Sequence, residues 1–133
     1  MAIPLDAFQI RSGSVLRSDI CVVGAGAVGI AIAREFAGTS HQVLLLESGD
    51  FQPDALTQSL YDVENIGHPL RMDTGYVSRN RYFGGSTNTW GGRCIPLNAI
   101  DFEARDWVKD SGWPFNKATL DPFYQRANEV LGL

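Results

Sequence analysis

Two short apolar runs and the amphipathic segment between them dominate the first fifty residues. Residues 19–24 (DICVVG) and 41–47 (HQVLLLE) are apolar at their centres and rich in branched side chains, which is typical of buried strands. Between them, residues 27–37 (AVGIAIAREFA) place apolar side chains near helical spacing, and Gly38 follows where a helix would end. A strand, a helix and a strand within about thirty residues form a βαβ unit with parallel strands. The predicted fold class is therefore α/β.

The rest of the chain has weaker patterns. A short helix is predicted over residues 55–61, and one or two helical turns over residues 101–107. Residues 81–93 are dominated by glycine and small polar residues, so we expect a shaped loop there and not a helix. Residues 121–122 (DP) have the form of an N-cap followed by proline in the first turn, which predicts a C-terminal helix that starts there and is capped by Gly132.

Composition is that of an ordinary globular protein. The chain has 133 residues, of which 44% are hydrophobic and 20% charged. Eleven basic against fifteen acidic residues give a net charge of −4, which argues against a nucleic-acid partner. Cys21 and Cys94 form no C-x-x-C pair, so neither a metal site nor a disulfide framework is expected. Cys21 is predicted to be an inert core thiol, and a reducing, cytoplasmic setting is expected.

The longest apolar run, residues 20–33, is too short to span a bilayer, which needs about 20 residues. An alternative is the core of a signal peptide, with Arg11 and Arg17 upstream and a cleavage-like site at residues 31–33. Three glycines within the run and Asp19 directly before it weaken that alternative. No membrane segment is therefore predicted.

The turn between the first strand and the helix carries the pattern G-x-G-x-x-G. Gly24 permits the tight turn, Gly26 lets a pyrophosphate approach the backbone, and Gly29 lets the helix pack close to the strand. A helix N-terminus there favours an anion. Glu47 ends the second strand, where a carboxylate can accept hydrogen bonds from adenosine ribose hydroxyls and disfavours a 2′-phosphate. The pattern predicts a dinucleotide site; the alternative is a glycine-rich turn that binds nothing.

A second motif lies at residues 81–93 (RYFGGSTNTWGGR), where two glycine pairs bracket small hydroxyl and amide side chains. Backbone of this kind can lie against a flat, polar ligand, and the serine, threonine and asparagine side chains can satisfy ring nitrogens and carbonyls. The alternative is a tight surface loop, since glycine clusters usually mark turns.

With both motifs in hand, the chain resembles the N-terminal FAD-binding part of the glucose–methanol–choline (GMC) oxidoreductases, in the branch of the sugar and sugar-acid dehydrogenases. The βαβ unit that ends in Glu47-Ser48-Gly49 looks like the adenosine-binding start of FAD enzymes, and residues 81–93 resemble the second GMC signature. Residues 106–124 are similar to the segment that leads into the substrate domain. The resemblance covers residues 18–133 and implies a Rossmann-like, incomplete FAD-binding domain after a lead-in of residues 1–17.

The resemblance also implies roles for individual residues. Gly24, Gly26 and Gly29 would hold the FAD pyrophosphate, and Glu47 would bind the adenosine ribose. The diphosphate, ribityl and flavin end would be bordered by residues of the second motif, namely Arg81, Gly84, Gly85, Ser86, Asn88 and Thr89. Members with a covalent flavin carry a histidine close to position 89, so Thr89 implies non-covalent FAD. Many members have asparagine where Trp90 stands.

The implied reaction is hydride transfer from the carbinol carbon of an alcohol or sugar to FAD. In the family a histidine near the C-terminus of a chain of about 500 residues removes the hydroxyl proton, and chains of that length usually contain several domains. His41 and His68 have no recognisable carboxylate partner, so no catalytic residue is predicted. We expect a fragment that is marginally folded and inactive alone, because two strands rarely make a stable sheet.

Two other functions stay open at this point. An NAD-dependent dehydrogenase would use the first motif alone and leaves the second unexplained. A non-catalytic nucleotide-binding module could be built on the same fold, since a fold does not determine a function.

Overall fold

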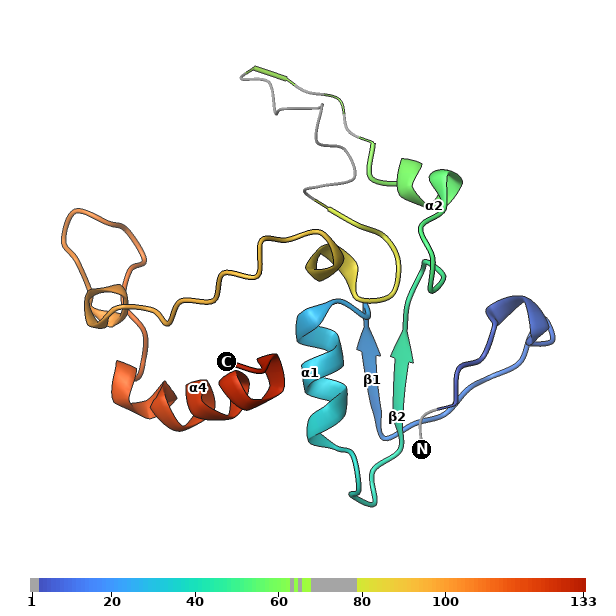
Figure 1. Ribbon diagram of the computed structural model, residues 1–133, viewed down its shortest axis with the longest axis horizontal. Helices are drawn as coiled ribbons and strands as arrows, with labels where there is room; N and C mark the ends of the chain where they lie inside the picture. Colours follow the sequence, from blue (N-terminus) through green and yellow to red (C-terminus); the bar gives the residue numbers. More distant parts are fainter. Residues whose placement is uncertain (1–2, 63, 65, 68–78) are drawn as a thin grey trace. The chain divides into compact units, whose positions relative to one another are not determined.

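The computed structural model describes residues 3–62, 64, 66–67 and 79–133. His68 lies outside the described residues. The chain divides into two compact units, Met1–Gly92 and Arg93–Leu133, and each is described by itself. Its elements are, in chain order (Figure 1), η1 (Ala7–Gln9), β1 (Ile20–Val23), α1 (Ala27–Glu35), β2 (Val43–Leu46), α2 (Ala55–Ser59), η3 (Gly85–Asn88), η4 (Ala99–Phe102) and α4 (Lys117–Leu131).

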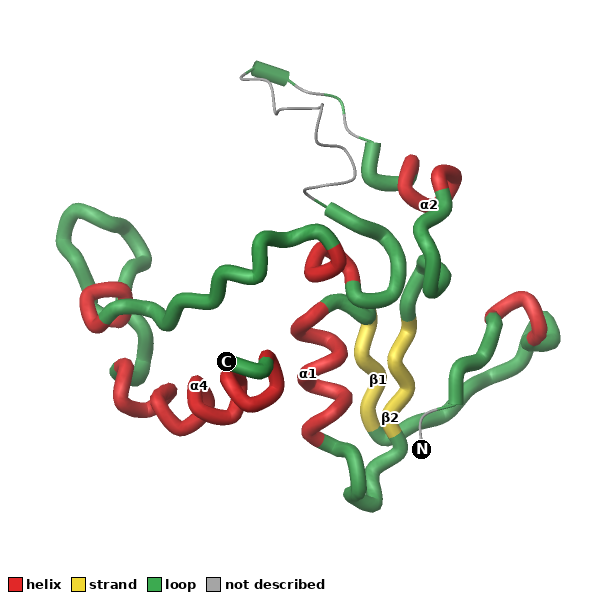
Figure 2. Tube along the Cα trace, in the orientation of Figure 1, coloured by secondary structure: helices red, strands yellow, loops and turns green. Residues whose placement is uncertain are grey.

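The first unit is built on the β1–α1–β2 crossover. The two strands pair in parallel, with Ile20 opposite Val43 at one end and Val23 opposite Leu46 at the other. Figure 2 shows α1 running alongside both strands. The predicted α/β class and the parallel pair of strands are confirmed. The helix ends at Glu35, so its C-cap is Phe36 and not the predicted Gly38.

One face of this sheet is left exposed. Val22 points toward α1, since its Cγ1 would lie 3.4 Å from a Cβ placed on Gly29. Side chains alternate along a strand, so Cys21 and Val23 point to the other face. Val23 is 82% exposed and the Cys21 thiol is exposed as well. The prediction that Cys21 is a core thiol is therefore wrong, because α1 covers the opposite face of β1.

The connecting segments contain short helical turns. The lead-in of residues 1–17 holds one 3₁₀ turn, η1, and is otherwise without regular structure in its described part. The predicted helix at residues 55–61 is present as α2, whose N-cap Asp54 accepts a hydrogen bond from the Thr57 backbone N–H. The prediction of a loop without helix over residues 81–93 is wrong at η3, where Asn88 side-chain bonds close a single 3₁₀ turn.

The second unit packs a helix and an aromatic cluster. Phe102 in η4 is 6% exposed and its ring lies 6.5 Å from that of Trp113 and 6.1 Å from that of Phe115, between centroids. The predicted turns at residues 101–107 are wrong in position, because the helical turn ends at Phe102.

The predicted start of the last helix is also wrong. Helix α4 begins at Lys117, because the side chain of Asn116 accepts a hydrogen bond from the Thr119 backbone N–H and caps it. Pro122 therefore lies inside the helix and not in its first turn. The predicted cap Gly132 is confirmed, with a φ of 72°. No helix within the described residues is long and apolar enough to cross a membrane.

Candidate dinucleotide site

The glycine elbow, residues 24–29, joins β1 to α1. Each of its three glycines lies in a different structural setting. Gly24 has a φ of 98°, and its N–H donates to the carbonyl oxygen of Leu46 at 2.7 Å. A Cβ on Gly29 would overlap the carbonyl oxygen of Gly24, so a side chain there would separate helix from strand. A Cβ on Gly26 would meet nothing within 4 Å. The backbone at Gly26 therefore borders open space.

The N-terminus of α1 faces this space without a side-chain cap. Gly26 is the N-cap residue and provides no side chain, and the Ile30 N–H is bonded to the Gly26 carbonyl oxygen at 2.9 Å. The N–H groups of the first turn have no acceptor inside the helix, and the helix dipole adds a partial positive charge. This arrangement suits a phosphate group.

The carboxylate of Glu47 lies against the elbow. Its Oε2 accepts a hydrogen bond from the Ala25 backbone N–H at 2.7 Å. Its Oε1 accepts from the backbone N–H groups of Ser48 and Gly49 at 2.9 and 3.0 Å, and from the Ser48 hydroxyl at 3.3 Å. A carboxylate has about four acceptor sites, two on each oxygen. Oε1 is therefore fully engaged, whereas Oε2 has capacity for one more donor, such as a ribose hydroxyl.

These contacts also set the charge of Glu47. Partial burial alone raises the pKa of this carboxyl, but the hydrogen bonds from the backbone N–H groups of Gly49, Ala25 and Ser48 outweigh it and hold the pKa below its ordinary value. The side chain is therefore an anion at neutral pH and acts only as an acceptor.

The glycine-rich loop, residues 81–90, packs directly onto the elbow. The Gly84 N–H donates to the carbonyl oxygen of Ala25 at 2.8 Å, and Gly84 forms a parallel bridge with Gly26. A Cβ on Gly85 would lie 3.2 Å from the Cα of Gly26. A Cβ on Gly49 would overlap the carbonyl oxygen of Arg81. The two motifs found in the sequence, together with the residues that follow β2, thus form one continuous backbone surface.

The polar side chains of this loop bond to the loop itself. The Ser86 hydroxyl accepts from the Asn80 N–H at 3.1 Å, and the Thr89 hydroxyl accepts from the Asn80 amide at 2.7 Å. The Asn88 amide donates to the carbonyl oxygens of Phe83 and Gly85, at 2.8 and 3.0 Å. Their assigned role beside a flavin stays a prediction; the observed contacts fix the shape of the loop.

Arg81 lies at the start of the loop. Its guanidinium is 4.8 Å from the ring centroid of Tyr61, and its backbone N–H donates to the side chain of Gln58 at 3.1 Å. The predicted contact of Arg81 with a diphosphate stays a prediction.

Several residues of the site were missed in the sequence. Ala25 provides a donor to Glu47 and an acceptor to Gly84, which are backbone functions that no side-chain pattern reveals. Asn80 anchors both Ser86 and Thr89, and its one sequence signal is its position directly before the second motif. A cavity of about 480 Å³ adjoins it, lined by Pro53, Ala55, Asn80, Tyr82 and Thr89.

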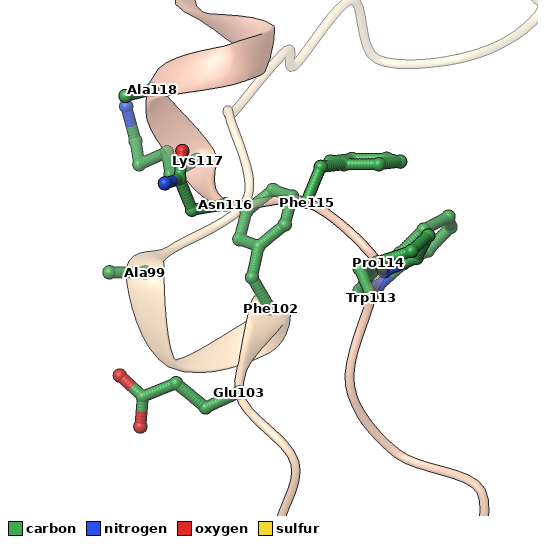
Figure 3. Close-up of a pocket in the computed structure, with 9 residues that line it drawn as sticks. All are labelled: Ala99, Phe102, Glu103, Trp113, Pro114, Phe115, Asn116, Lys117 and Ala118. Carbon is green, nitrogen blue, oxygen red and sulfur yellow. The ribbon is translucent and has the colours of Figure 1, made fainter.

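The second unit has an open hollow of about 450 Å³ beside its aromatic cluster (Figure 3). Phe102, Trp113 and Phe115 form one wall, while Glu103 and Lys117 reach its rim. Lys117 is paired with Asp121 at 2.6 Å. We assign no ligand to this hollow, since its rings mainly pack against one another.

His41, the histidine within the described residues, lies away from Glu47. His41 precedes β2, whereas Glu47 follows it, so the two lie at opposite ends of the strand. The ring of His41 packs edge-on against Phe36, with 5.8 Å between centroids. Within the described part of the chain no group of three metal-ligating side chains occurs.

The residues present fit a dinucleotide cofactor such as FAD. Open space at Gly26, an uncapped helix N-terminus and a carboxylate oxygen with spare acceptor capacity lie within one elbow. The elbow could hold the pyrophosphate and Glu47 a ribose, and both roles stay predictions.

Comparison with known proteins gave two relatives. The chain is 28% identical over 125 residues to 6'''-hydroxyparomomycin C oxidase of Streptomyces lividus and, over the same length, to paromamine 6'-oxidase of Streptomyces fradiae. Each match covers 86% of this chain and 23% of the relative, so the chain spans about a quarter of their length. No protein-family model and no solved structure matches the chain. Both relatives are named as oxidases, which agrees with an oxidoreductase function at a coarse level.

Proposed function

We propose that this chain is the FAD-binding part of a GMC-type oxidoreductase that oxidises a CH–OH group of a sugar or related alcohol. The proposal includes a Rossmann-like fold, non-covalent FAD, and a catalytic base located elsewhere in the complete enzyme. The printed names of the two relatives support the oxidoreductase class. The cofactor is proposed from the site itself.

The contact between the two motifs carries the proposal. The elbow alone suits any dinucleotide, including NAD. The glycine-rich loop starts about 60 residues later, yet Gly84 bonds to Ala25 and pairs with Gly26 at the N-cap of α1. A ligand whose pyrophosphate lies at Gly26 therefore has this second backbone surface beside it. The ribityl-flavin half of FAD is larger than the nicotinamide riboside half of NAD and would use this additional surface.

The chain's residues would bind and orient the cofactor. The N–H groups at the start of α1 would bind the pyrophosphate, and Oε2 of Glu47, which already accepts from the Ala25 N–H, would accept from an adenosine ribose hydroxyl. A negative carboxylate at that position repels a 2′-phosphate, so NADP is disfavoured. FAD held there would supply a hydride acceptor for the carbinol carbon, while a base elsewhere in the complete enzyme would take the hydroxyl proton, so that the alcohol would become a carbonyl.

Cofactor titration tests the proposal. FAD, NAD and NADP are titrated against the full chain, with flavin fluorescence reporting FAD and calorimetry reporting all three. We expect FAD to bind and NADP to fail. Glu47→Gln, which removes the ribose acceptor charge, should weaken FAD about tenfold, the loss of a charge-assisted hydrogen bond.

Asp19→Asn is the matched control. The carboxylate of Asp19 also accepts a backbone hydrogen bond across the two strands, from Gln42 at 2.8 Å, but at the other end of the sheet. Its substitution should leave FAD affinity within about twofold, since it is remote from the elbow. Binding of NAD without FAD would refute the flavin assignment and favour an NAD-dependent dehydrogenase.

A further inference from the structure

Asn80 is a buried polar residue whose hydrogen bonds are incomplete. The residue is 5% exposed. The backbone N–H donates to the Ser86 hydroxyl, and Nδ2 donates to the Thr89 hydroxyl. Oδ1 is out of contact with solvent, and no donor among the described residues reaches it. A buried acceptor without a donor is costly and needs an explanation.

The Thr89 hydroxyl fixes which amide atom is unpaired. This hydroxyl lies 3.4 Å from the Ser86 carbonyl oxygen and donates to it. It has one hydrogen, so toward Asn80 it must act as acceptor, which requires Nδ2 on that side. Oδ1 is therefore the atom left over, and its missing partner is a hydrogen-bond donor.

Space for such a donor lies beside Asn80. The adjoining cavity of about 480 Å³ has apolar walls from Pro53, Ala55 and Tyr82, and Asn80 and Thr89 supply its polar groups. Mostly apolar walls with a few placed polar groups are typical of small-molecule sites. Asn80 itself lines this pocket, and the terminal torsion of an asparagine has a broad, shallow preference, so rotation of the amide would bring Oδ1 within reach of a bound donor.

We propose that Asn80 is a further binding residue for the flavin-side half of the dinucleotide, and that Oδ1 accepts a hydrogen bond from a ribityl hydroxyl or from the ring imide N–H. This inference rests on the proposed function. Glu47 and the elbow are taken up by adenosine and pyrophosphate. The glycine-rich loop meets the elbow at Gly84, whereas Asn80 is bonded to Ser86 within η3 and, through its side chain, to Thr89 after it. Because the elbow and Glu47 are assigned to the other groups of the ligand, we assign the donor at Asn80 to the flavin-side half.

The experiment compares FAD with ADP, which lacks the flavin-side half, on the full chain. Asn80→Ala should weaken FAD about five- to tenfold, the effect of one hydrogen bond, and leave ADP within twofold. Asn80→Leu removes the same polar atoms but keeps the volume filled, so it should give the same ratio without a cavity. Retained ADP affinity shows that the elbow is still folded in either variant.

Gln58→Ala is the matched control. The side chain of Gln58 holds the backbone on both sides of Asn80, since its Nε2 donates to the Arg79 carbonyl oxygen at 2.8 Å and its Oε1 accepts from the Arg81 backbone N–H at 3.1 Å. We expect its FAD-to-ADP affinity ratio to stay that of the parent protein. Equal FAD-to-ADP affinity ratios in the parent and in both Asn80 variants would overturn the role of Oδ1, and so would the same change of this ratio in Gln58→Ala. Neither result would overturn the proposed function. A parent that binds neither ligand would overturn the proposed function, and this inference with it.

Discussion

The addition of one methyl group should have different effects at two glycines of the elbow, on stability at one and on ligand affinity at the other. In Gly29→Ala the new Cβ overlaps the carbonyl oxygen of Gly24, a backbone atom that cannot rotate aside. In Gly26→Ala the new Cβ meets no atom within 4 Å, and the backbone has an ordinary φ of −78°. The first change should therefore affect the fold, and the second should affect the ligand.

The magnitudes follow from these contacts. Alanine in a helix is favoured over glycine by about 1 kcal/mol, whereas overpacking costs about 1–3 kcal/mol or more. Because the overlap at Gly29 is with backbone, we place the cost at the upper end and expect a net destabilisation of about 2 kcal/mol. At Gly26, reduced entropy of the unfolded chain opposes the poorer N-cap, so stability should change by less than about 1 kcal/mol.

Thermal unfolding followed by circular dichroism measures the first effect, and FAD titration the second. At about 4 °C per kcal/mol, Gly29→Ala should lower the Tm by about 8 °C. Gly26→Ala should keep the parent Tm but lose at least about tenfold in FAD affinity, because its methyl fills the space proposed for the pyrophosphate. A Gly29→Ala protein as stable as the parent would refute the packing argument. A Gly26→Ala protein that binds FAD normally would refute the placement of the pyrophosphate.

Three further predictions concern charge and capping. The pKa of Glu47 is lower in the folded state than in the unfolded state. The carboxylate therefore stabilises the fold above the unfolded pKa of about 4.3, and this stabilisation is lost as the pH falls through the folded pKa. In Glu47→Gln the free energy of unfolding should depend less steeply on pH in that acidic range. Asn116→Ala should destabilise the second unit by about 1 kcal/mol, seen in urea unfolding, because the cap of α4 is lost. Pro122→Ala should raise the stability of that unit in the same assay, because proline inside a helix is unfavourable by up to about 3 kcal/mol; an unchanged midpoint would contradict this.

Local pattern was sufficient to predict the crossover. The bounds of β1, α1 and β2 lie within two residues of those predicted, because branched apolar runs and a glycine turn act over short distances. Glu47 also lies beside the elbow, as expected because it directly follows β2, which runs parallel to β1. What pattern could not supply was the bond between Gly84 and Ala25, which depends on backbone atoms far apart in sequence.

The errors have identifiable physical causes. The start of α4 was misplaced because Asp121-Pro122 has the composition of a helix start, while the actual cap, Asn116, lies just after the aromatic segment. Cys21 was expected inside the core because a parallel strand is usually covered on both faces, whereas α1 covers one face. The first error was a choice between two local cap sequences, whereas the second arose because the burial of a residue depends on which element packs against it.

The hydrogen bonds that hold Glu47 have a consequence for affinity. A free glutamate samples many rotamers, and fixing it costs up to about 2 kcal/mol of side-chain entropy. Here three backbone N–H donors have already selected one orientation, with Oε2 at the elbow. A nucleotide bound as proposed would therefore meet a preorganised acceptor and would lose little of its interaction energy to ordering the protein.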